Sequence, residues 1–202
     1  MRITKQQADE NKTRVVETAA RLFREKGFDG ISVAELMQAA GMTHGGFYNH
    51  FESKQDLEAA ACAHVFAKSV AAIAAIAEIA APDERAQAFA AYKRRYVSKK
   101  VRDASATACP MVAFAGDVSR QPGAVREEYA AGFRRYLAAF ALANAGDRLD
   151  DEARKQARRE AIAQFATLAG ARSLARSVAE TDPALSDEIL EAATAALGPK
   201  AG

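Results

Sequence analysis

The stretch of sequence that decides the fold is SVAELMQAAGMTHGGFYNHF, residues 32–51. Its first four residues form a capping box: the Ser32 hydroxyl can accept a free amide of the first helical turn, and Glu35 can accept the Ser32 amide in return. A short helix is therefore expected from Ser32 to Ala40.

A second helix is expected directly after the first. Gly41-Met42 makes a tight turn, and Thr43 is a natural N-cap for a helix that ends at His50 or Phe51. Two short helices joined by a glycine-containing turn predict a helix-turn-helix. An ordinary helical hairpin in an unrelated bundle is the alternative.

The second of these helices has two distinct sides. Phe47 and Phe51 are four residues apart and can both face inward, which leaves small and polar residues outside. Small residues at the N-terminal end let the backbone approach a DNA groove closely, while polar side chains offer donors to phosphates and base edges. The predicted DNA-binding residues are Ser32, Thr43, His44, Gly45, Gly46, Tyr48, Asn49, His50 and Lys54.

Two of these residues also have a plainer interpretation. An exposed histidine such as His44 is usually a solvated surface residue, and His50 is equally compatible with packing at the junction with the next helix. Lys54 stands at the head of that helix, where the helix-end amides already favour an anion.

The rest of the chain also reads as helices. The first is expected from about Asn11 to Lys26, with Gly27 ending it. Another begins at the capping Ser53 and runs to about Ala80. Further helices are expected at about 84–102, 109–118, 122–144, 151–180 and 183–197. The sequence thus predicts an all-α protein of about nine helices, with an architectural boundary near Ser53 that lies within a continuous helical body.

Composition agrees with an all-α class. The 202 residues are 50% hydrophobic with few Gly and Pro, and a net charge of +2 is too small to identify a nucleic-acid binder. Cys62 and Cys109, far apart in sequence, fit a reducing cytoplasm rather than a disulfide scaffold. The N-terminus has no apolar core of signal-peptide length, and the longest apolar stretch, residues 70–82, is too short to span a bilayer. We therefore expect a soluble, cytoplasmic protein without a membrane partner.

No motif supports catalysis. The chain has no glycine-rich phosphate loop, no zinc-protease motif and no evident nucleophile-base-acid set. With three histidines and no clustered ligands, metal binding is not expected. The sequence predicts neither an enzyme nor a bound cofactor.

A set of short motifs carries a family resemblance. They are Phe23-Arg24-Glu25-Lys26-Gly27-Phe28, Ser32-Val33-Ala34-Glu35-Leu36, Ala40-Gly41-Met42, Phe47-Tyr48-Asn49-His50-Phe51 and Ser53-Lys54-Gln55-Asp56-Leu57. In these residues, which cover roughly the first quarter of the chain, the sequence resembles the TetR family of transcriptional regulators. Gly46 departs from the family's pattern, since many members carry Ser, Thr or Ala there, so the base preference is not carried over.

The resemblance implies a function. It implies a three-helix DNA-binding head, here residues 1–52, on a helical effector-binding and dimerisation body, here residues 53–202. It also implies a homodimer that binds double-stranded DNA at a palindromic operator, usually as a repressor, and that responds to a small-molecule effector. From the helix faces we expect the dimer to be held mainly by the last two helices, 151–180 and 183–197. A helical module that senses a small molecule without binding DNA is the alternative function.

The body contains a set of aromatic residues whose spacing fits either a core or a pocket. The predicted effector-binding residues are Phe89, Tyr92, Cys109, Phe114, Tyr129, Phe133 and Phe165. Cys109 stands at a helix start, where the helix dipole would lower its pKa, so it reads either as a redox or electrophile sensor or as a packed core cysteine. The basic run Lys93 to Arg102 reads either as a second DNA contact or, preferably, as a solvated helix face paired with neighbouring acids.

Overall fold

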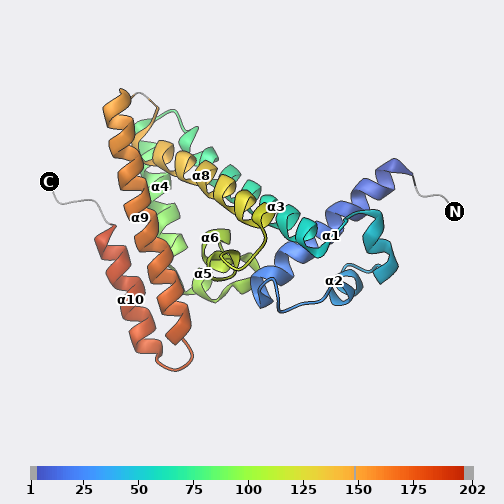
Figure 1. Ribbon diagram of the computed structural model, residues 1–202. Helices are drawn as coiled ribbons and strands as arrows, with labels where there is room; N and C mark the ends of the chain where they lie inside the picture. Colours follow the sequence, from blue (N-terminus) through green and yellow to red (C-terminus); the bar gives the residue numbers. More distant parts are fainter. Residues whose placement is uncertain (1–3, 148, 198–202) are drawn as a thin grey trace. The chain divides into compact units, whose positions relative to one another are not determined.

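The computed structural model describes residues 4–147 and 149–197, which contain ten α-helices, two 3-10 helices and no strand. The first three residues, on which the expectation about a signal peptide partly rests, lie outside this description. In chain order the helices are α1 (Lys5–Lys26), α2 (Val33–Ala39), η1 (His44–Asn49), α3 (Lys54–Ala77), α4 (Pro82–Tyr96), α5 (Lys99–Asp103), η2 (Ser105–Thr107), α6 (Pro110–Ala113), α7 (Ala115–Val118), α8 (Gly123–Ala145), α9 (Asp151–Val178) and α10 (Pro183–Ala196) (Figure 1). The all-α prediction is confirmed.

The chain divides into two compact units. One consists of residues 4–68 and 105–133, and the other of the remaining described residues from 69 onward. Helices α3 and α8 each begin in the first unit and end in the second. The first unit therefore contains the predicted DNA-binding head together with η2, α6, α7 and parts of α3 and α8.

The first unit is built around α1. This helix begins at Lys5, earlier than the predicted Asn11, because the Thr4 side chain accepts the Gln7 amide and so caps it. It ends at Gly27, whose φ of 77° and bond to the Phe23 carbonyl terminate the helix as predicted. Its buried side packs on α2, η2 and α6.

Helices α3 and α8 meet in the first unit through aromatic residues. The rings of Phe66 and Tyr129 lie edge to face with centroids 5.4 Å apart. Gly132 is buried against Phe66, and a Cβ at this position would lie 2.3 Å from the Phe66 ring. Glycine is therefore required for the two helices to approach this closely.

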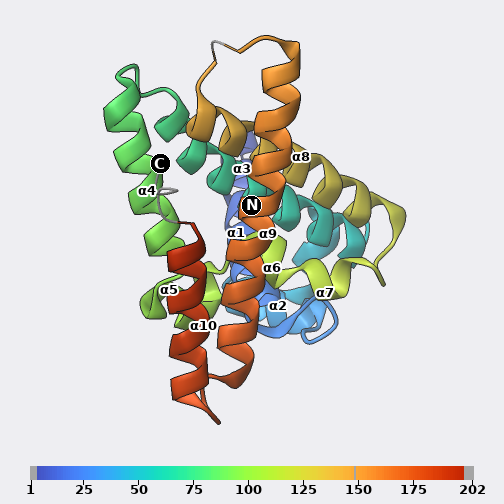
Figure 2. The same cartoon turned by 90° about the vertical axis from the view of Figure 1, so that its left-hand side faces the viewer.

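The second unit has an aromatic core and a helical hairpin. Helices α9 and α10 run side by side, joined by a short turn (Figure 2). The fully buried Ser186 on α10 donates to the Ala175 carbonyl on α9 over 2.7 Å. The guanidinium of Arg102 on α5 donates to the same hydroxyl at 2.6 Å, which ties α5 to the hairpin.

Two predicted helices are interrupted. The one expected at 84–102 is divided into α4 and α5, because the Ser98 hydroxyl accepts the Val101 amide and starts a new helix. The one expected at 109–118 is divided into α6 and α7 at Phe114. The prediction of about nine helices was therefore too low for the described residues.

Helix α3 is unusually apolar. Its length and a mean hydropathy of 1.7 would allow it to cross a membrane, which holds for no other helix of the described part of the chain. The apolar stretch identified from the sequence, residues 70–82, covers only the end of this helix, so the apolar segment is longer than that stretch. The helix begins with the charged Lys54, Asp56 and Glu58, and it buries Leu57, Phe66 and Ile73 within the fold.

Candidate nucleic-acid interface

The local sequence positions the helix-turn-helix through caps and a glycine turn. The Ser32 hydroxyl accepts the Glu35 amide at 3.3 Å, and the Glu35 carboxylate accepts the Ser32 amide at 2.8 Å, so the predicted capping box is confirmed. Gly41 has a φ of 73°, a conformation that favours glycine, and its amide bonds to the Gln38 carbonyl. The turn after α2 therefore has the geometry that its sequence predicts.

The predicted recognition helix η1 is a 3-10 helix with one buried and one exposed side. Phe47 and Phe51 are 1% and 6% exposed, and their rings stack with centroids 5.5 Å apart. The opposite side consists of exposed residues, namely Thr43, His44, Gly45, Tyr48 and Asn49. Gly46 and His50 are half-buried at its margins. The predicted division into inward and outward residues is confirmed, whereas the contact of these residues with DNA stays a prediction.

Tyr48 is the most exposed large hydrophobic residue of the described part of the chain. Its side chain is 66% exposed, and its ring is fixed by edge-to-face contacts with Phe47 at 5.3 Å and His44 at 6.1 Å. A ring held on two sides presents its hydroxyl in a defined direction. The arrangement thus offers one phenol, one imidazole and one amide, from Asn49, on a single face of a short helix.

Lys54 has a different environment from the one expected of a phosphate contact. Its Nζ donates to the Phe28 carbonyl over 2.6 Å and lies 3.7 Å from Glu58 Oε1. Its side chain is 24% exposed. In this structure the amine links α3 to the turn after α1, and its predicted phosphate contact would have to compete with these bonds.

Lys12 is a cation beside the recognition helix that the sequence did not single out. It lies on α1, and its Nζ is 5.4 Å from the centre of the Phe51 ring. Lys12 and Phe51 are far apart in sequence, so only tertiary packing brings this charge near the predicted DNA-binding surface.

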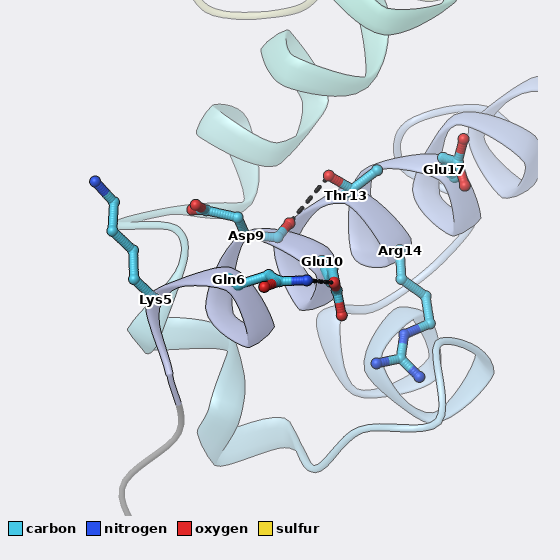
Figure 3. A pocket seen from close by; sticks show the side chains of 7 residues that line it. All are labelled: Lys5, Gln6, Asp9, Glu10, Thr13, Arg14 and Glu17. Atoms are coloured by element: carbon cyan, nitrogen blue, oxygen red, sulfur yellow. Dashed lines mark hydrogen bonds between the residues drawn. The ribbon is translucent and has the colours of Figure 1, made fainter.

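An open hollow of about 720 Å³ lies against the N-terminal part of α1 (Figure 3). Its lining consists of Lys5, Gln6, Asp9, Glu10, Thr13, Arg14 and Glu17. Several of these side chains are bonded within the helix, as Gln6 is to Glu10 and Thr13 to the Asp9 carbonyl. None of the predicted site residues lies here, and a hollow lined by one helix lacks the enclosure of a small-molecule site.

The predicted effector residues fall into two aromatic clusters, one in each unit. In the first unit Tyr129 lies 6.2 Å from Phe133, and its hydroxyl donates to the Met111 carbonyl over 3.1 Å. Burial, with a smaller effect of Cys109 and Cys62, raises the pKa of Tyr129 to about 12. Phe114 stacks on Phe28 at 4.9 Å, so it belongs to the junction with the head.

Cys109 lies in the first unit as well. It is 8% exposed, and its thiol lies 3.9 Å from the sulfur of Met111. The helix that it precedes, α6, has only four residues, which leaves little dipole to lower the thiol pKa. Both observations favour the packed-cysteine interpretation over the sensor.

The second cluster contains Phe89, Tyr92 and Phe165 in the second unit. Tyr136 and Phe140 complete it: Phe140 lies 4.8 Å from Phe89, and Tyr136 lies 5.0 Å from Phe165. The hydroxyls of Tyr92 and Tyr136 are 2.6 Å apart, a hydrogen bond within the cluster. Tyr136 and Phe140 are not among the predicted effector residues, because their place in this cluster depends on helix packing.

Three cations of the basic run, Lys93, Lys99 and Arg102, have partners in the second unit. Lys99 pairs with Asp187 at 2.7 Å, and Arg102 pairs with Asp103 and bonds Ser186. Lys93 lies 4.8 Å from the centre of the Phe89 ring, and burial lowers its pKa. These contacts favour the interpretation as a helix face paired with neighbouring residues over a second DNA contact.

Comparison with known sequences identifies the N-terminal part of the chain. The family described as bacterial regulatory proteins, tetR family, matches residues 15–61. The transcriptional regulator AcrR of Shigella flexneri is 43% identical over 56 residues, 28% of this chain and 26% of AcrR. TtgR of Pseudomonas putida is 35% identical over 57 residues, 28% of this chain and 27% of TtgR. The chain thus matches about a quarter of the length of these relatives.

Solved structures resemble the chain over nearly its full length. The reduced form of NemR from E. coli has a TM-score of 0.73 at 19% identity, with 93% of this chain and 94% of NemR covered. A TetR-family regulator from Agrobacterium tumefaciens has a TM-score of 0.69 at 23% identity, with 92% and 98% covered. These similarities establish the fold beyond the head, where sequence identity is low.

Proposed function

We propose that this member of the TetR family of bacterial regulatory proteins is a DNA-binding transcriptional regulator, a repressor that a small-molecule effector releases from its operator. The relatives that match the head are named as transcriptional regulators rather than enzymes. The observation that carries the proposal is the exposed side of η1, where Tyr48, His44 and Asn49 project opposite the buried Phe47 and Phe51.

A short helix with this arrangement suits the major groove. The buried phenylalanines fix the helix to the head, so the exposed side chains keep their positions when they meet DNA. His44 and Asn49 would contact base edges and Tyr48 a phosphate, flanked by Lys12 and by the amide end of α2 at Ser32. Gly45 carries no side chain and permits a close approach.

The proposal includes a homodimer formed by α9 and α10. These helices leave Ile162 and Leu174 46% and 60% exposed, and nothing lies within 4 Å of a Cβ placed at Gly170. An apolar helix face with an open glycine suits close packing against a second copy. Two heads would then bind half-sites about 34–36 Å apart, one turn of DNA, which explains a palindromic operator.

The proposed effector binds among the aromatic residues of the body, and the two clusters around Tyr129 and Tyr136 are the candidates. Together they combine a large apolar area with three tyrosine hydroxyls, from Tyr92, Tyr129 and Tyr136, and sites for small, mostly apolar molecules have this composition. A thermal-shift screen against small metabolites and electrophiles tests this part, because a ligand that binds only the folded state raises its melting temperature.

A gel-shift titration tests DNA binding itself. The probe is the DNA upstream of the protein's own gene, titrated at several salt concentrations with an unrelated duplex as competitor. Specific binding that weakens as salt rises is expected, since phosphate contacts release counterions. A variant with Tyr48, His44 and Asn49 all replaced by Ala is the control and should retain only non-specific binding. Absence of a salt-dependent shift would favour a sensor module without DNA binding.

A further inference from the structure

The turn between α1 and α2 is anchored from outside the three-helix head. Both backbone polar groups of Phe28 have side-chain partners: its amide donates to Asp117 Oδ2 over 3.3 Å, and its carbonyl accepts from Lys54 Nζ at 2.6 Å. Asp117 lies on α7, 89 residues further along the chain. A buried backbone group without a partner costs free energy, so loss of the Asp117 carboxylate would destabilise the turn. One of the turn's two anchors therefore comes from α7.

The glycine before Phe28 is adapted to this carboxylate. A Cβ on Gly27 would lie 2.6 Å from Asp117 Oδ2, closer than real Cβ contacts allow. The φ of 77° at Gly27 also favours glycine. Glycine is therefore favoured at position 27 for two independent reasons: its positive φ, and the Asp117 carboxylate, which occupies the space that a Cβ would need.

The Phe28 ring strengthens the same connection. It is fully buried and stacks on Phe114, at the junction of α6 and α7, with centroids 4.9 Å apart. Its other neighbour is Phe23 on α1, at 5.2 Å. The turn is thus held to the segment 110–118 by one stacked ring and one charge-assisted hydrogen bond.

The anchored turn leads directly into the helix-turn-helix. Ser32, the N-cap of α2, follows Phe28 by four residues, and α2 in turn packs on η1. We propose that Asp117 is a positioning residue for DNA binding: from outside the helix-turn-helix it fixes the turn that orients α2 and the recognition helix. This inference rests on the proposed function, and it makes the segment 105–133 part of the DNA-binding unit.

Charge and geometry can be separated with two variants. Loss of a carboxylate strengthens the attraction to DNA whatever its role, because DNA is an anion. Asp117→Asn removes the charge and keeps an oxygen that can accept the Phe28 amide, whereas Asp117→Ala removes both. Arg120→Ala is the matched control, since the Arg120 side chain is 65% exposed and its guanidinium donates to the other carboxylate oxygen, Asp117 Oδ1, at 2.6 Å.

The experiment has two readouts on the full-length protein. Amide hydrogen exchange of Phe28 is measured without DNA, and affinity is measured for an operator duplex and for an unrelated duplex. Asp117→Ala is expected to speed Phe28 exchange about tenfold and to weaken operator binding about tenfold, with affinity for unrelated DNA unchanged or higher. Asp117→Asn should recover most of both losses, and Arg120→Ala should leave Phe28 exchange unchanged.

The outcomes against the proposal are distinct from failure of the proposed function. If Asp117→Ala left Phe28 exchange unchanged, the carboxylate would not hold the turn. If exchange accelerated while operator affinity stayed the same, Asp117 would anchor the turn without positioning the recognition helix. If Asn and Ala changed operator affinity equally, charge alone would act. Failure of the wild type to bind any operator would refute the DNA-binding function, whereas the exchange measurement would still report the anchor.

Discussion

The side chain of Tyr48 is 66% exposed, so burial of its ring contributes little to the stability of the fold. Its contribution to DNA binding must therefore come from its hydroxyl or from a contact with DNA. Because Tyr48→Phe removes only the hydroxyl, we expect it to weaken binding to operator and unrelated DNA alike by about 3- to 10-fold, the value of one hydrogen bond. Quantitative gel shifts on both duplexes measure this effect. A loss confined to the operator would assign the hydroxyl to a base instead.

Asn49 provides the contrasting prediction, because its amide can pair with a base edge. Asn49→Ala is expected to lower operator affinity by about 1–3 kcal/mol and to reduce discrimination against one mismatched base pair. A panel of operators with single substitutions identifies that position. Uniform weakening across the panel would place Asn49 on the sugar-phosphate backbone.

Glu58 makes stability depend on pH. It is 2% exposed, its Oε1 lies 3.7 Å from Lys54 Nζ, and its Oε2 lacks a hydrogen-bond partner. Burial raises its pKa, with Asp29 adding to this effect and Lys54 opposing it. A carboxyl with a raised folded-state pKa contributes stability below its unfolded pKa, and that contribution is lost as pH rises through the folded value.

The predicted consequence is that Glu58→Gln melts higher than the wild type at neutral pH, with the difference shrinking toward about pH 4. Thermal unfolding across this range measures it. Glu52→Gln, an exposed glutamate at the same junction, is the control and should show no such trend. A lower melting temperature of Glu58→Gln than of the wild type at neutral pH would mean that the ion pair between Glu58 and Lys54 outweighs the cost of burying the carboxylate.

The sequence predicts which side chains of the helix-turn-helix face inward, but it does not predict which residues of other helices they contact. The four-residue spacing of Phe47 and Phe51 fixes which side of η1 is buried, since spacing is a local property. Lys54 was predicted as a phosphate contact from its place at a helix start. Its bond to the Phe28 carbonyl and the position of Lys12 over Phe51 depend on contacts between residues far apart, which spacing does not encode.

Helix η1 contains two adjacent glycines that differ in surroundings. A Cβ on Gly45 would meet nothing within 4 Å, whereas one on Gly46 would touch Thr43 Oγ1 at 3.5 Å and Met37 Cε at 3.8 Å. Neither glycine has a positive φ, so alanine fits both backbones. Because glycine costs a helix up to about 1 kcal/mol relative to alanine, each Gly→Ala variant should be more stable by up to that amount.

The two variants should differ on DNA. A methyl at the exposed Gly45 would hold the helix backbone away from the groove, so Gly45→Ala is expected to weaken operator binding about tenfold. Gly46→Ala, whose methyl faces Met37, should retain it. Thermal melts combined with operator titrations test both parts. Equal operator affinity in the two variants would contradict a close backbone approach at Gly45.

Helix existence was more predictable than helix boundaries. The caps at Ser32 and Ser53 are local signals, and both are present, with the Ser53 hydroxyl accepting the Asp56 amide at 3.1 Å. The interruption at Ser98 was missed because the apolar pattern continues across it, although the capping serine was visible. The 3-10 geometry of η1 was missed for a similar reason, since glycines lower α-helix propensity without specifying the alternative.

Over the complete chain, the predicted boundary at residues 52 and 53 is an architectural one, and it stays a prediction. The compact unit that contains the head also includes residues 53–68 and 105–133. Its long-range contacts, such as Phe28 with Phe114, join residues that no local pattern connects. The effector set illustrates the same limit, because aromatic content identifies candidates and only packing divides them into two clusters.

Assembly gives the last prediction. Leu174 on α9 is 60% exposed, and in a twofold contact each substitution occurs twice, so Leu174→Asp would bring two carboxylates into one apolar interface. We expect sedimentation of this variant to show monomer, with helix content preserved. Operator affinity should fall at least about 100-fold, because the two half-sites no longer bind through one linked molecule.

Leu142→Asp is the matched control for this variant. Leu142 is 45% exposed, close to the 46% of Ile162, but it lies on α8 outside the proposed interface. If α9 and α10 form the dimer, Leu142→Asp remains dimeric and binds operator, whereas Ile162→Asp behaves like Leu174→Asp. The aspartates at positions 142 and 162 add the same charge at similar exposure. A general effect of that charge on solubility or on the attraction to DNA would therefore appear in both Leu142→Asp and Ile162→Asp. Dissociation of Leu142→Asp alone would move the interface to α8.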